Sequence, residues 1–319
     1  MDEATQQAHG DDTQSPTPTI APPPFDKPSA DIVLRTADYV DFCVRRAILE
    51  EASAVFADMF SLPQPSPGAD SSSRTPPILV SEDSKTIEAL LRMCYPVSDP
   101  EFASLDELKP AMEAARKYQM DGLMPTFTRR LVALSGLFPL QAYALALQYG
   151  MEDTARVAAK HFLSLPHPWR YVAELEHISG GAYFRLLSYR EACAQAAKGA
   201  TRGTEWLEDG KYTWFTCGSA DCPRPKARNK VCIMSIRGGD EIEARPYFDV
   251  HLARTAALLA AKPSRSTVDH AGAYMQLVQD AAPCSTCKSL IAADASRFHQ
   301  NLALEVDKRV NEVVLKIKL

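Results

Sequence analysis

Four cysteines are the residues of this sequence whose type and spacing most suit chemistry. They fall into two pairs, Cys217-x4-Cys222 and Cys284-x2-Cys287. Zinc binds four soft ligands in a tetrahedron, and a cysteine pair on a tight turn supplies two thiolates at a suitable separation. The two pairs therefore predict a structural zinc site whose four ligands all come from the protein. The alternative is four unrelated reduced cysteines, because a free cysteine often packs as a small hydrophobic residue.

Other residues extend or limit this candidate site. His251 and His270 lie between the two pairs in sequence, and either can replace one thiolate as a zinc ligand. Three further cysteines, Cys43, Cys94 and Cys193, fall on apolar faces of predicted elements, so we expect them in the core. The predicted metal site is thus confined to the C-terminal part of the chain.

A basic segment is the second feature whose residue types could bind a ligand. The stretch PRPKARNK places Arg224, Lys226, Arg228 and Lys230 in one loop, where they can meet phosphate groups. The chain as a whole has a formal charge of -5, whereas proteins that bind nucleic acids usually present a basic face. We therefore expect a solvated loop and a partner other than nucleic acid.

Motifs of the common catalytic centres are missing from the sequence. It contains no H-E-x-x-H, G-x-S-x-G or Walker-type segment, and Gly238-Gly239 lacks the strand–helix context of a dinucleotide site. Serine, histidine and acidic residues are present, but nothing in the sequence places them together. We therefore expect no enzyme activity and no small-molecule substrate.

Length and composition indicate an ordinary globular protein. The chain has 319 residues, of which 46% are hydrophobic and 24% charged. No apolar run reaches the roughly 18 residues of a membrane span, and the N-terminal MDEATQQAHGDD is too acidic for a secretory signal. Without secretion, the eight cysteines are expected to be reduced. We therefore expect a cytoplasmic or nuclear protein without a membrane partner.

The elements that must position the cysteine pairs lie in residues 201–319, predicted to be a hairpin plus helices. A strand over KYTWFTCGSADC runs into a tight turn, and VCIMSIR forms the returning strand, which gives a hairpin over 211–236. Because residues 201–228 offer little apolar content, we expect the metal to fasten this hairpin to the last helix. That helix, from Ser289, carries one apolar stripe: Ile291, Ala295, Phe298, Leu302, Val306, Val310, Val314 and Ile317.

Three regions precede these elements. Residues 1–28 include TQSPTPTIAPPPFDKP, whose dense prolines and polar remainder predict a disordered tail. Residues 29–135 combine short strands, the first over DIVLRT, with amphipathic helices, one of them over AARKYQMDGL. Residues 136–200 are predicted to form pairs of helices, in which alanines allow close approach.

Residues 29–135 resemble the BTB/POZ domain, particularly as it appears in many fungal proteins. The segments that carry the resemblance are DIVL, FCVRRAIL, SAVFADMF, ILV, IEALLRMCY and AARKYQMDGL. The resemblance implies an α+β fold, in which a small sheet is flanked by helices and followed by a helical extension over 136–200. Ala115, Tyr118 and Leu123 match the apolar positions of the family's A-x-x-Y-x-x-x-x-L helix, which implies that they build core.

Two positions depart from the family pattern. The family commonly has histidine in F-x-x-H after the second strand, where this chain has Arg45. The family's buried acid in the first strand matches Asp31, which implies an interaction between Asp31 and Arg45. Members that recruit cullin scaffolds often carry a hydrophobic-x-Glu signature after the M-F. Here Met59-Phe60 leads into SLPQPSPG without a glutamate, which argues against cullin binding.

The resemblance implies a non-enzymatic protein–protein interaction module, a scaffold or adaptor whose partners are other proteins. Two alternatives stay open: a substrate adaptor of a cullin-type ubiquitin ligase, and a DNA-associated transcriptional regulator that uses the basic loop or the cysteine-bearing hairpin. Family members often dimerise by exchanging an N-terminal strand and helix. The segment before Asp31, PTPTIAPPPFDKPSA, cannot easily be helical, so we expect this exchange to be absent or weak.

Overall fold

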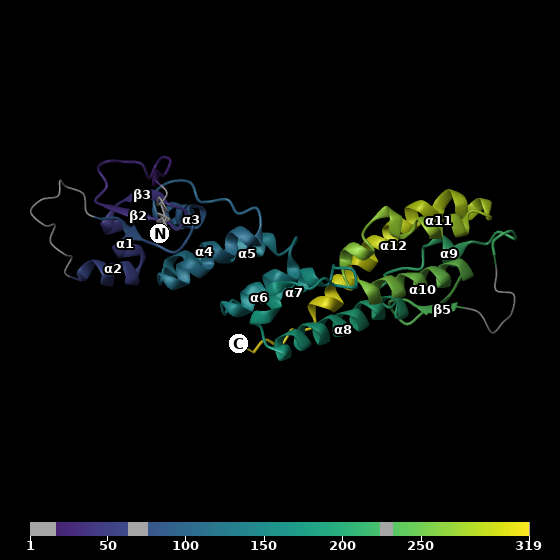
Figure 1. The fold of residues 1–319 in the computed structure, drawn as a ribbon. Helices are drawn as coiled ribbons and strands as arrows, with labels where there is room; N and C mark the ends of the chain where they lie inside the picture. The colour runs from purple at the N-terminus through teal and green to yellow at the C-terminus, as the bar shows by residue number, and fades with distance from the viewer. Residues whose placement is uncertain (1–16, 63–75, 224–231, 319) are drawn as a thin grey trace, which may run out of the picture. The chain divides into compact units, whose positions relative to one another are not determined.

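The computed structural model describes residues 17–62, 76–223 and 232–318, and its fold is drawn in Figure 1. The chain divides into two compact units, Met1–Leu131 and Val132–Leu319. The basic loop of Arg224, Lys226, Arg228 and Lys230 and the first 16 residues of the predicted tail lie outside the described residues.

A small mixed sheet forms the centre of the first unit. Its strand order is β1 (Thr19–Ile20), β3 (Val40–Val44), β2 (Ile32–Arg35) and β4 (Ile78–Leu79). The two central strands pair antiparallel, with Leu34 opposite Phe42, and each outer strand pairs parallel to its neighbour. The alternation in IVLR is a strand pattern with period two, and it buries Ile32 and Leu34 while the residues between them stay partly exposed.

The α-helices that accompany this sheet in the described residues are α1 (Arg46–Ala52), α2 (Ala54–Ser61), α3 (Ser84–Cys94), α4 (Leu105–Lys117) and α5 (Met124–Leu134). The apolar residues after Arg45 predict one helix, but the structure breaks it at Ser53. Ser53 has extended backbone angles, and its hydroxyl accepts the N–H of Phe56 at 3.1 Å and donates to the Tyr118 carbonyl at 2.5 Å. A serine bonded in this way starts a new helix rather than continuing the old one.

The segment AARKYQMDGL closes the core of the first unit. Ala115, Tyr118 and Leu123 are all buried, which confirms the prediction that they build core. The Tyr118 ring stacks on Phe56 with ring centroids 4.8 Å apart, and its hydroxyl donates to the Glu82 carboxylate at 2.5 Å. Leu123 lies in the short helix η1 (Asp121–Leu123) that follows α4.

Part of the predicted tail belongs to the folded domain. Residues 17–28 were expected to be disordered because of their prolines, yet Thr19–Ile20 pairs with β3 and Phe25 is fully buried. The Phe25 ring lies 5.3 Å from the Tyr95 ring, and its carbonyl accepts the N–H of Cys43 at 2.8 Å. Thr19 and Ala21 also donate their backbone N–H groups to the carbonyls of Tyr39 and Asp41. A buried aromatic ring and these backbone bonds therefore hold the segment in spite of its prolines.

The second unit begins with a pair of helices, α6 (Pro139–Gln148) and α7 (Glu152–Phe162). Gly150 between them has a φ of 69°, a conformation that favours glycine. The helix η2 (Ala173–His177) and the long α8 (Gly180–Arg202) follow, and α8 packs against α10 (Pro246–Ala261) and α12 (Ser285–Asn311).

One buried arginine joins the ends of two helices in this unit. The Arg190 guanidinium, on α8, donates to the carbonyls of Phe162, Leu163 and Leu165 at 3.1–3.2 Å. It also donates to the carbonyl of Ala261, the last residue of α10, at 2.5 Å. Carbonyls at helix C-termini have no partner within the helix and carry partial negative charge. A guanidinium there donates hydrogen bonds to these carbonyls and also offsets their charge. No pattern in the sequence predicts this role.

The hairpin of the second unit differs from the one predicted. Its strands are β5 (Cys232–Ser235) and β6 (Glu241–Ala244), paired antiparallel across a tight turn in which Gly238 and Gly239 have positive φ. VCIMSIR was correctly predicted as a strand, but KYTWFTCGSADC was wrongly predicted as its partner. Thr213–Thr216 is instead a short helix, α9. The two-glycine turn lets β5 pair with the segment that immediately follows it, which leaves residues 211–222 free to adopt another conformation.

The last helix matches its predicted stripe except at the C-terminal end. It is preceded by η4 (Arg265–Thr267), η5 (Ala271–Ala273) and α11 (Met275–Ala281). The helix α12 begins at Ser285 and ends at Asn311, so Val314 lies beyond it and is exposed. The stripe residues inside the helix are all buried: Ile291, Ala295, Phe298, Leu302, Val306 and Val310.

Candidate metal centre

The second cysteine pair lies at the start of α12. Cys284 is the residue that precedes the first turn, and Cys287 lies within that turn. The backbone N–H of Cys287 bonds to the Cys284 sulfur, as the free N–H groups at a helix start commonly do with an acceptor. This local geometry directs both sulfurs to the same side of the helix start.

The first cysteine pair comes from the segment that follows α9. Cys217 ends this short helix, with its N–H bonded to the Thr213 carbonyl at 3.0 Å. The chain then turns, and the N–H of Cys222 bonds to the Ser219 carbonyl at 3.2 Å. A helix end followed by a tight turn replaces the hairpin turn that the sequence predicts, and it brings the two sulfurs together just as well.

The four sulfurs meet in one cluster. All four Sγ atoms lie within 4.8 Å of one another. Two contacts join the two segments: Cys217 to Cys284 at 3.8 Å, and Cys222 to Cys287 at 3.6 Å. None of the four cysteines forms a disulfide in this structure, and sulfurs in a disulfide lie about 2.05 Å apart. The structure thus brings together the four residues that the sequence selects as metal ligands.

The cluster has the size of a site for a single metal ion. A tetrahedral ion with Zn–S bonds of about 2.3 Å separates its sulfurs by about 3.8 Å, close to the two distances above. A cluster of two or four iron atoms would divide the cysteines among several irons and would hold cysteines on different irons farther apart. Four soft ligands in this arrangement can hold a metal ion such as zinc.

The four thiols are shielded from water. Cys217 and Cys222 are 5% and 3% exposed, and Cys284 and Cys287 are fully buried. Burial raises the pKa of the Cys222 thiol to about 11 and also raises that of Cys287. The N–H of Cys287 lowers the pKa of the Cys284 thiol to about 7. With all four positions supplied by buried side chains, the site leaves no open place for water or substrate, which is typical of structural metal sites.

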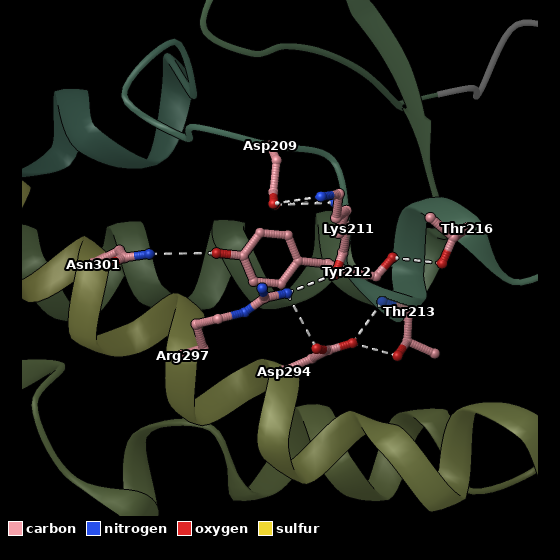
Figure 2. A network of polar contacts seen from close by, with 8 residues as sticks. All are labelled: Asp209, Lys211, Tyr212, Thr213, Thr216, Asp294, Arg297 and Asn301. Carbon is pink, nitrogen blue, oxygen red and sulfur yellow. Dashed lines mark hydrogen bonds and ion pairs between the residues drawn. The ribbon is translucent and has the colours of Figure 1, made fainter.

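A polar network holds the segment just before Cys217, from Lys211 to Thr213, against α12, as Figure 2 shows. The Asp294 carboxylate, on α12, accepts the backbone N–H of Thr213 at 2.7 Å and also the Thr213 hydroxyl. Arg297 donates to the Lys211 carbonyl at 2.5 Å, and its guanidinium lies 4.2 Å from the centre of the Tyr212 ring. These bonds start α9 at a fixed place, one turn before Cys217.

Stacked aromatic rings fill the space behind this segment. Trp214 is fully buried between Tyr212 and Phe248, with ring centroids 4.8 and 4.3 Å away, and the Phe298 ring meets it edge-on at 5.6 Å. The expectation that this region has too little apolar content to hold itself is therefore wrong. Two large aromatic residues anchor it, so a metal would secure mainly the turn from Cys217 to Cys222.

The structure does not bring the alternative ligands into the cluster. The Nε2 atom of His251 lies 2.8 Å from Nε2 of His299, and His270 lies in the loop region before α11. Of the cysteines expected in the core, Cys193 is fully buried, whereas Cys43 and Cys94 are partly buried.

Asp31 and Arg45 do not form an ion pair in the described part of the chain. The Asp31 carboxylate is exposed and accepts the N–H of Arg46, the first residue of α1, at 2.8 Å. The Arg45 side chain donates to the Ser29 hydroxyl at 3.0 Å, and its backbone N–H donates to the Tyr95 hydroxyl at 2.7 Å. Asp31 therefore serves as a cap for α1, a role that its place in the family's first strand did not suggest.

Sequence reasoning missed two polar residues beside the cluster. The Arg245 guanidinium donates to the Cys217 carbonyl, and the Tyr247 hydroxyl donates to the Cys287 sulfur at 3.5 Å. Both residues lie at the start of α10, whose first residue is Pro246, a position that suits proline. Nothing in the local sequence indicates that this helix start faces the cysteines, because the contact depends on how β6 and α10 pack in the folded unit.

Comparison with known proteins identifies one domain. Residues 25–134 match the family model described as the BTB/POZ domain. A search of curated proteins finds no match to the chain. Among the helices of the described residues, none is long and apolar enough to cross a membrane. The chain thus contains a BTB/POZ domain with a small mixed sheet flanked by helices, followed by a mainly helical region that holds the cysteine cluster. The predicted fold class is confirmed.

Proposed function

We propose that this protein is a non-enzymatic scaffold or adaptor that binds other proteins through its BTB/POZ domain. The observation that carries the proposal is the match of residues 25–134 to this domain, which is a protein–protein interaction module. In this account, the C-terminal unit extends the domain with a stable helical body.

We further propose that the protein is located in the cytoplasm or the nucleus, where thiols stay reduced. That the domain is of the kind found in fungal proteins stays a hypothesis.

Chemical cross-linking of the tagged full-length chain in cells, followed by mass spectrometry, tests this function. Lysines occur in both units, among them Lys85, Lys109 and Lys117 in the first and Lys160 and Lys262 in the second. We expect partner peptides to be linked mainly to the lysines of the first unit. Partners linked only to the second unit would contradict an interaction role for the BTB/POZ domain.

We also propose that Cys217, Cys222, Cys284 and Cys287 bind one structural zinc ion. The support is their mutual distance of at most 4.8 Å, their burial and the soft character of four sulfur ligands. Such an ion would fasten the turn after α9 to the start of α12, two segments that are more than 60 residues apart in sequence.

The metal content of protein purified without added zinc tests this site. We expect about one equivalent of zinc per chain, because a site with four thiolates binds zinc tightly. The Cys284→Ser/Cys287→Ser variant should lose it, whereas Cys43→Ser, which changes a cysteine of the first unit, should keep it. Less than about 0.2 equivalents in the unaltered protein would rule out the site.

Two narrower functions remain as alternatives. The first is a substrate adaptor of a cullin-type ubiquitin ligase, and the glutamate missing after Met59-Phe60 argues against it. Retention of the purified chain on immobilised cullin scaffolds would favour it. The second is a DNA-associated regulator that uses the basic loop, which lies outside the described residues. Salt-dependent retention on DNA would favour that alternative, because phosphate contacts weaken as salt rises.

The N-terminal segment bears on whether two chains form a dimer by exchanging it. We propose that exchange of this segment between two chains is absent or weak, which leaves a monomer or an assembly formed with a partner. The support is that Thr19 and Ile20 pair with β3 of their own chain, and that Phe25 fills the core of their own domain. Light scattering that shows a tight dimer, lost when residues 1–30 are deleted, would contradict this.

A further inference from the structure

A cationic side chain lies against the cysteine cluster, and no acidic residue of the described part of the chain pairs with it. The Arg245 guanidinium donates through Nη2 to the Cys217 carbonyl, and its Nε atom is buried and has no hydrogen-bond partner among the described residues. The ion pairs between described residues include several arginines of this unit, among them Arg237 with Glu208, but none involves Arg245. A partly buried guanidinium is costly to leave without a counter-charge.

The position of Arg245 is fixed by the backbone. Its N–H donates to the Trp214 carbonyl at 3.0 Å, which ties the start of α10 to α9. This bond and the bond from Nη2 hold the residue at both of its ends beside the segment that carries Cys217. The guanidinium is therefore held beside the cluster by its surroundings, and it is not a flexible surface charge.

A second group directs a donor at the cluster from the same helix start. The Tyr247 side chain is 6% exposed, and its hydroxyl donates to the Cys287 sulfur at 3.5 Å. A neutral thiol is a weak acceptor, whereas an ionised group makes a much stronger hydrogen bond. A buried phenol with this sulfur as its acceptor is therefore better satisfied by a thiolate.

These two groups match the charge of a metal-bound cluster. Four thiolates around a divalent ion carry a net charge of about −2, which a buried site must balance. Groups outside the ligand shell commonly do so by donating hydrogen bonds to the ligands, and they orient those ligands as well. Four neutral thiols would give neither the guanidinium nor the phenol a comparable partner.

We propose that Arg245 and Tyr247 are outer-shell residues of the metal centre, which stabilise a negatively charged divalent metal–tetrathiolate cluster and set how tightly it holds its ion. This inference rests on the proposed zinc site. Neither residue is a ligand. Arg245 supplies a counter-charge and positions the Cys217 loop through its carbonyl, whereas Tyr247 donates a hydrogen bond to the Cys287 thiolate.

Cobalt substitution of the full-length chain tests the inference, because Co²⁺ bound to thiolates absorbs visible and near-ultraviolet light. The variants are Arg245→Gln, Arg245→Lys and Tyr247→Phe, and the matched control is Arg237→Gln, which alters an exposed arginine of the neighbouring hairpin. We expect all of them to give the absorption of a tetrahedral four-thiolate site. In Tyr247→Phe the sulfur-to-cobalt band should move to lower energy, because its thiolate loses a hydrogen bond.

The affinity for zinc, measured by competition with a chelator, provides the second readout. Loss of an outer-shell group typically weakens metal binding about 10–100-fold. We expect a loss of this size for Arg245→Gln and Tyr247→Phe, a partial recovery for Arg245→Lys, and no change for Arg237→Gln. Tryptophan fluorescence confirms that each variant is folded.

The outcomes separate this inference from the proposed zinc site. If the unaltered chain binds cobalt through four thiolates while the variants match it within about twofold in affinity and in band position, the outer-shell role is overturned and the metal site stands. If the unaltered chain binds neither cobalt nor zinc, both are overturned. A weaker affinity together with a shifted band supports the role, because a change in packing alone would not move the band.

Discussion

The two units of this protein join distant segments with different kinds of polar group. In the first, bonds from hydroxyl groups accompany the apolar core, such as that from Ser53 to the Tyr118 carbonyl, 65 residues away, and that from Tyr118 to Glu82. In the second, a buried cluster of four cysteines joins segments 65 and 67 residues apart, and the buried Arg190 donates to carbonyls that include Ala261, 71 residues away. The second unit thus concentrates its long-range polar contacts on a few buried groups.

The two units therefore also differ in the chemical groups on which their stability depends. The stability of the first unit comes mainly from apolar burial. Because the hydrophobic effect is non-directional, this stability does not depend on one charged group or one bound ion. The long-range contacts of the second unit depend on a charged guanidinium, on neutral imidazoles and, by our proposal, on a metal ion. Each of these can be removed by one substitution or one change of solution, and each removal should affect the second unit alone.

Among the substitutions compared at neutral pH, Arg190→Met should give the largest loss of stability. It removes the donor to the carbonyls of Leu163, Leu165 and Ala261, whereas the Phe162 carbonyl keeps the N–H of Leu165, and each buried unsatisfied acceptor costs about 1–3 kcal/mol. We expect the free energy of unfolding of the second unit to fall by about 3–5 kcal/mol. All three tryptophans, Trp169, Trp206 and Trp214, lie in this unit, so denaturation followed by tryptophan fluorescence reports on it.

Two further variants control this measurement. Arg190→Lys should lose less, because an ammonium keeps the charge but reaches fewer carbonyls. Arg156→Met removes an exposed arginine paired with Glu152, and such surface pairs contribute about 0–1 kcal/mol. Equal losses for Arg190→Met and Arg156→Met would show that Arg190 is not a helix-joining residue.

A buried histidine pair should make the second unit sensitive to acid. The Nδ1 atom of His299 donates to the Val268 carbonyl at 2.9 Å, so Nε2 of His299 accepts the proton on Nε2 of His251 at 2.8 Å. Burial lowers the pKa of His251 to about 3, aided by the charges of His299 and Arg254 and opposed by Asp280. Burial lowers the pKa of His299 to about 4, aided by His270 and opposed by the Val268 carbonyl.

Because both folded-state pKa values are depressed, the unfolded chain binds the extra protons. The contribution of the pair is complete above the unfolded pKa of about 6.5, and it is lost as the pH falls from there toward 4. In that window each histidine should remove at most about 1.4 kcal/mol of unfolding free energy per pH unit, reached where it is protonated in the unfolded chain and neutral in the folded one. Denaturation curves at several pH values should show this slope in the tryptophan signal.

A paired substitution isolates the histidine contribution from that of the acidic residues. In His251→Gln/His299→Gln, unfolding should take up fewer protons, by up to about two, so the unfolding free energy should vary less between pH 6.5 and 4. This holds even if the double substitution lowers stability at neutral pH. His177→Gln changes an exposed histidine of the same unit and is the control. A slope that stays the same in the double variant would contradict the account.

The smallest expected effect compares one tyrosine from each unit. Tyr118→Phe removes the bond to Glu82, which keeps Lys117 as its partner at 2.7 Å, and we expect a cost of about 1–2 kcal/mol in the first unit. Hydrogen exchange of α4 peptides measures it. By our proposal Tyr247→Phe acts through metal affinity, so a chelator should remove its effect and leave that of Tyr118→Phe unchanged. Equal sensitivity to the chelator would erase the distinction between the units.

Local patterns in the sequence predicted much of the first unit and the long helix of the second. The alternation in IVLR, the helix through Tyr118 and the stripe through Phe298 all repeat at short intervals, so they can be recognised without a structure. The proline-rich segment around Phe25 was misjudged because a buried ring and a few backbone bonds outweigh an unfavourable composition.

The cysteine ligands could also be selected from the sequence, since metal-ligand pairs have characteristic spacings. Their surroundings could not. Cys217 was expected on a hairpin, but Asp294 starts a helix there from a position 81 residues away in sequence. The contacts of Arg190, Arg245 and Tyr247 form only in the folded chain and produce no repeating pattern in the sequence. Such residues are found only when the packing of distant elements is known.

Hydrogen exchange with and without a zinc chelator tests the central claim most directly. Full-length protein is compared in both conditions, with mass spectrometry resolving its peptides. We predict that the chelator increases exchange in the peptides around Cys217–Cys222 and at the start of α12, while peptides from residues 17–131 keep their protection. Unchanged exchange around the four cysteines, or equal loss of protection in both units, would contradict the claim that a metal ion fastens the second unit.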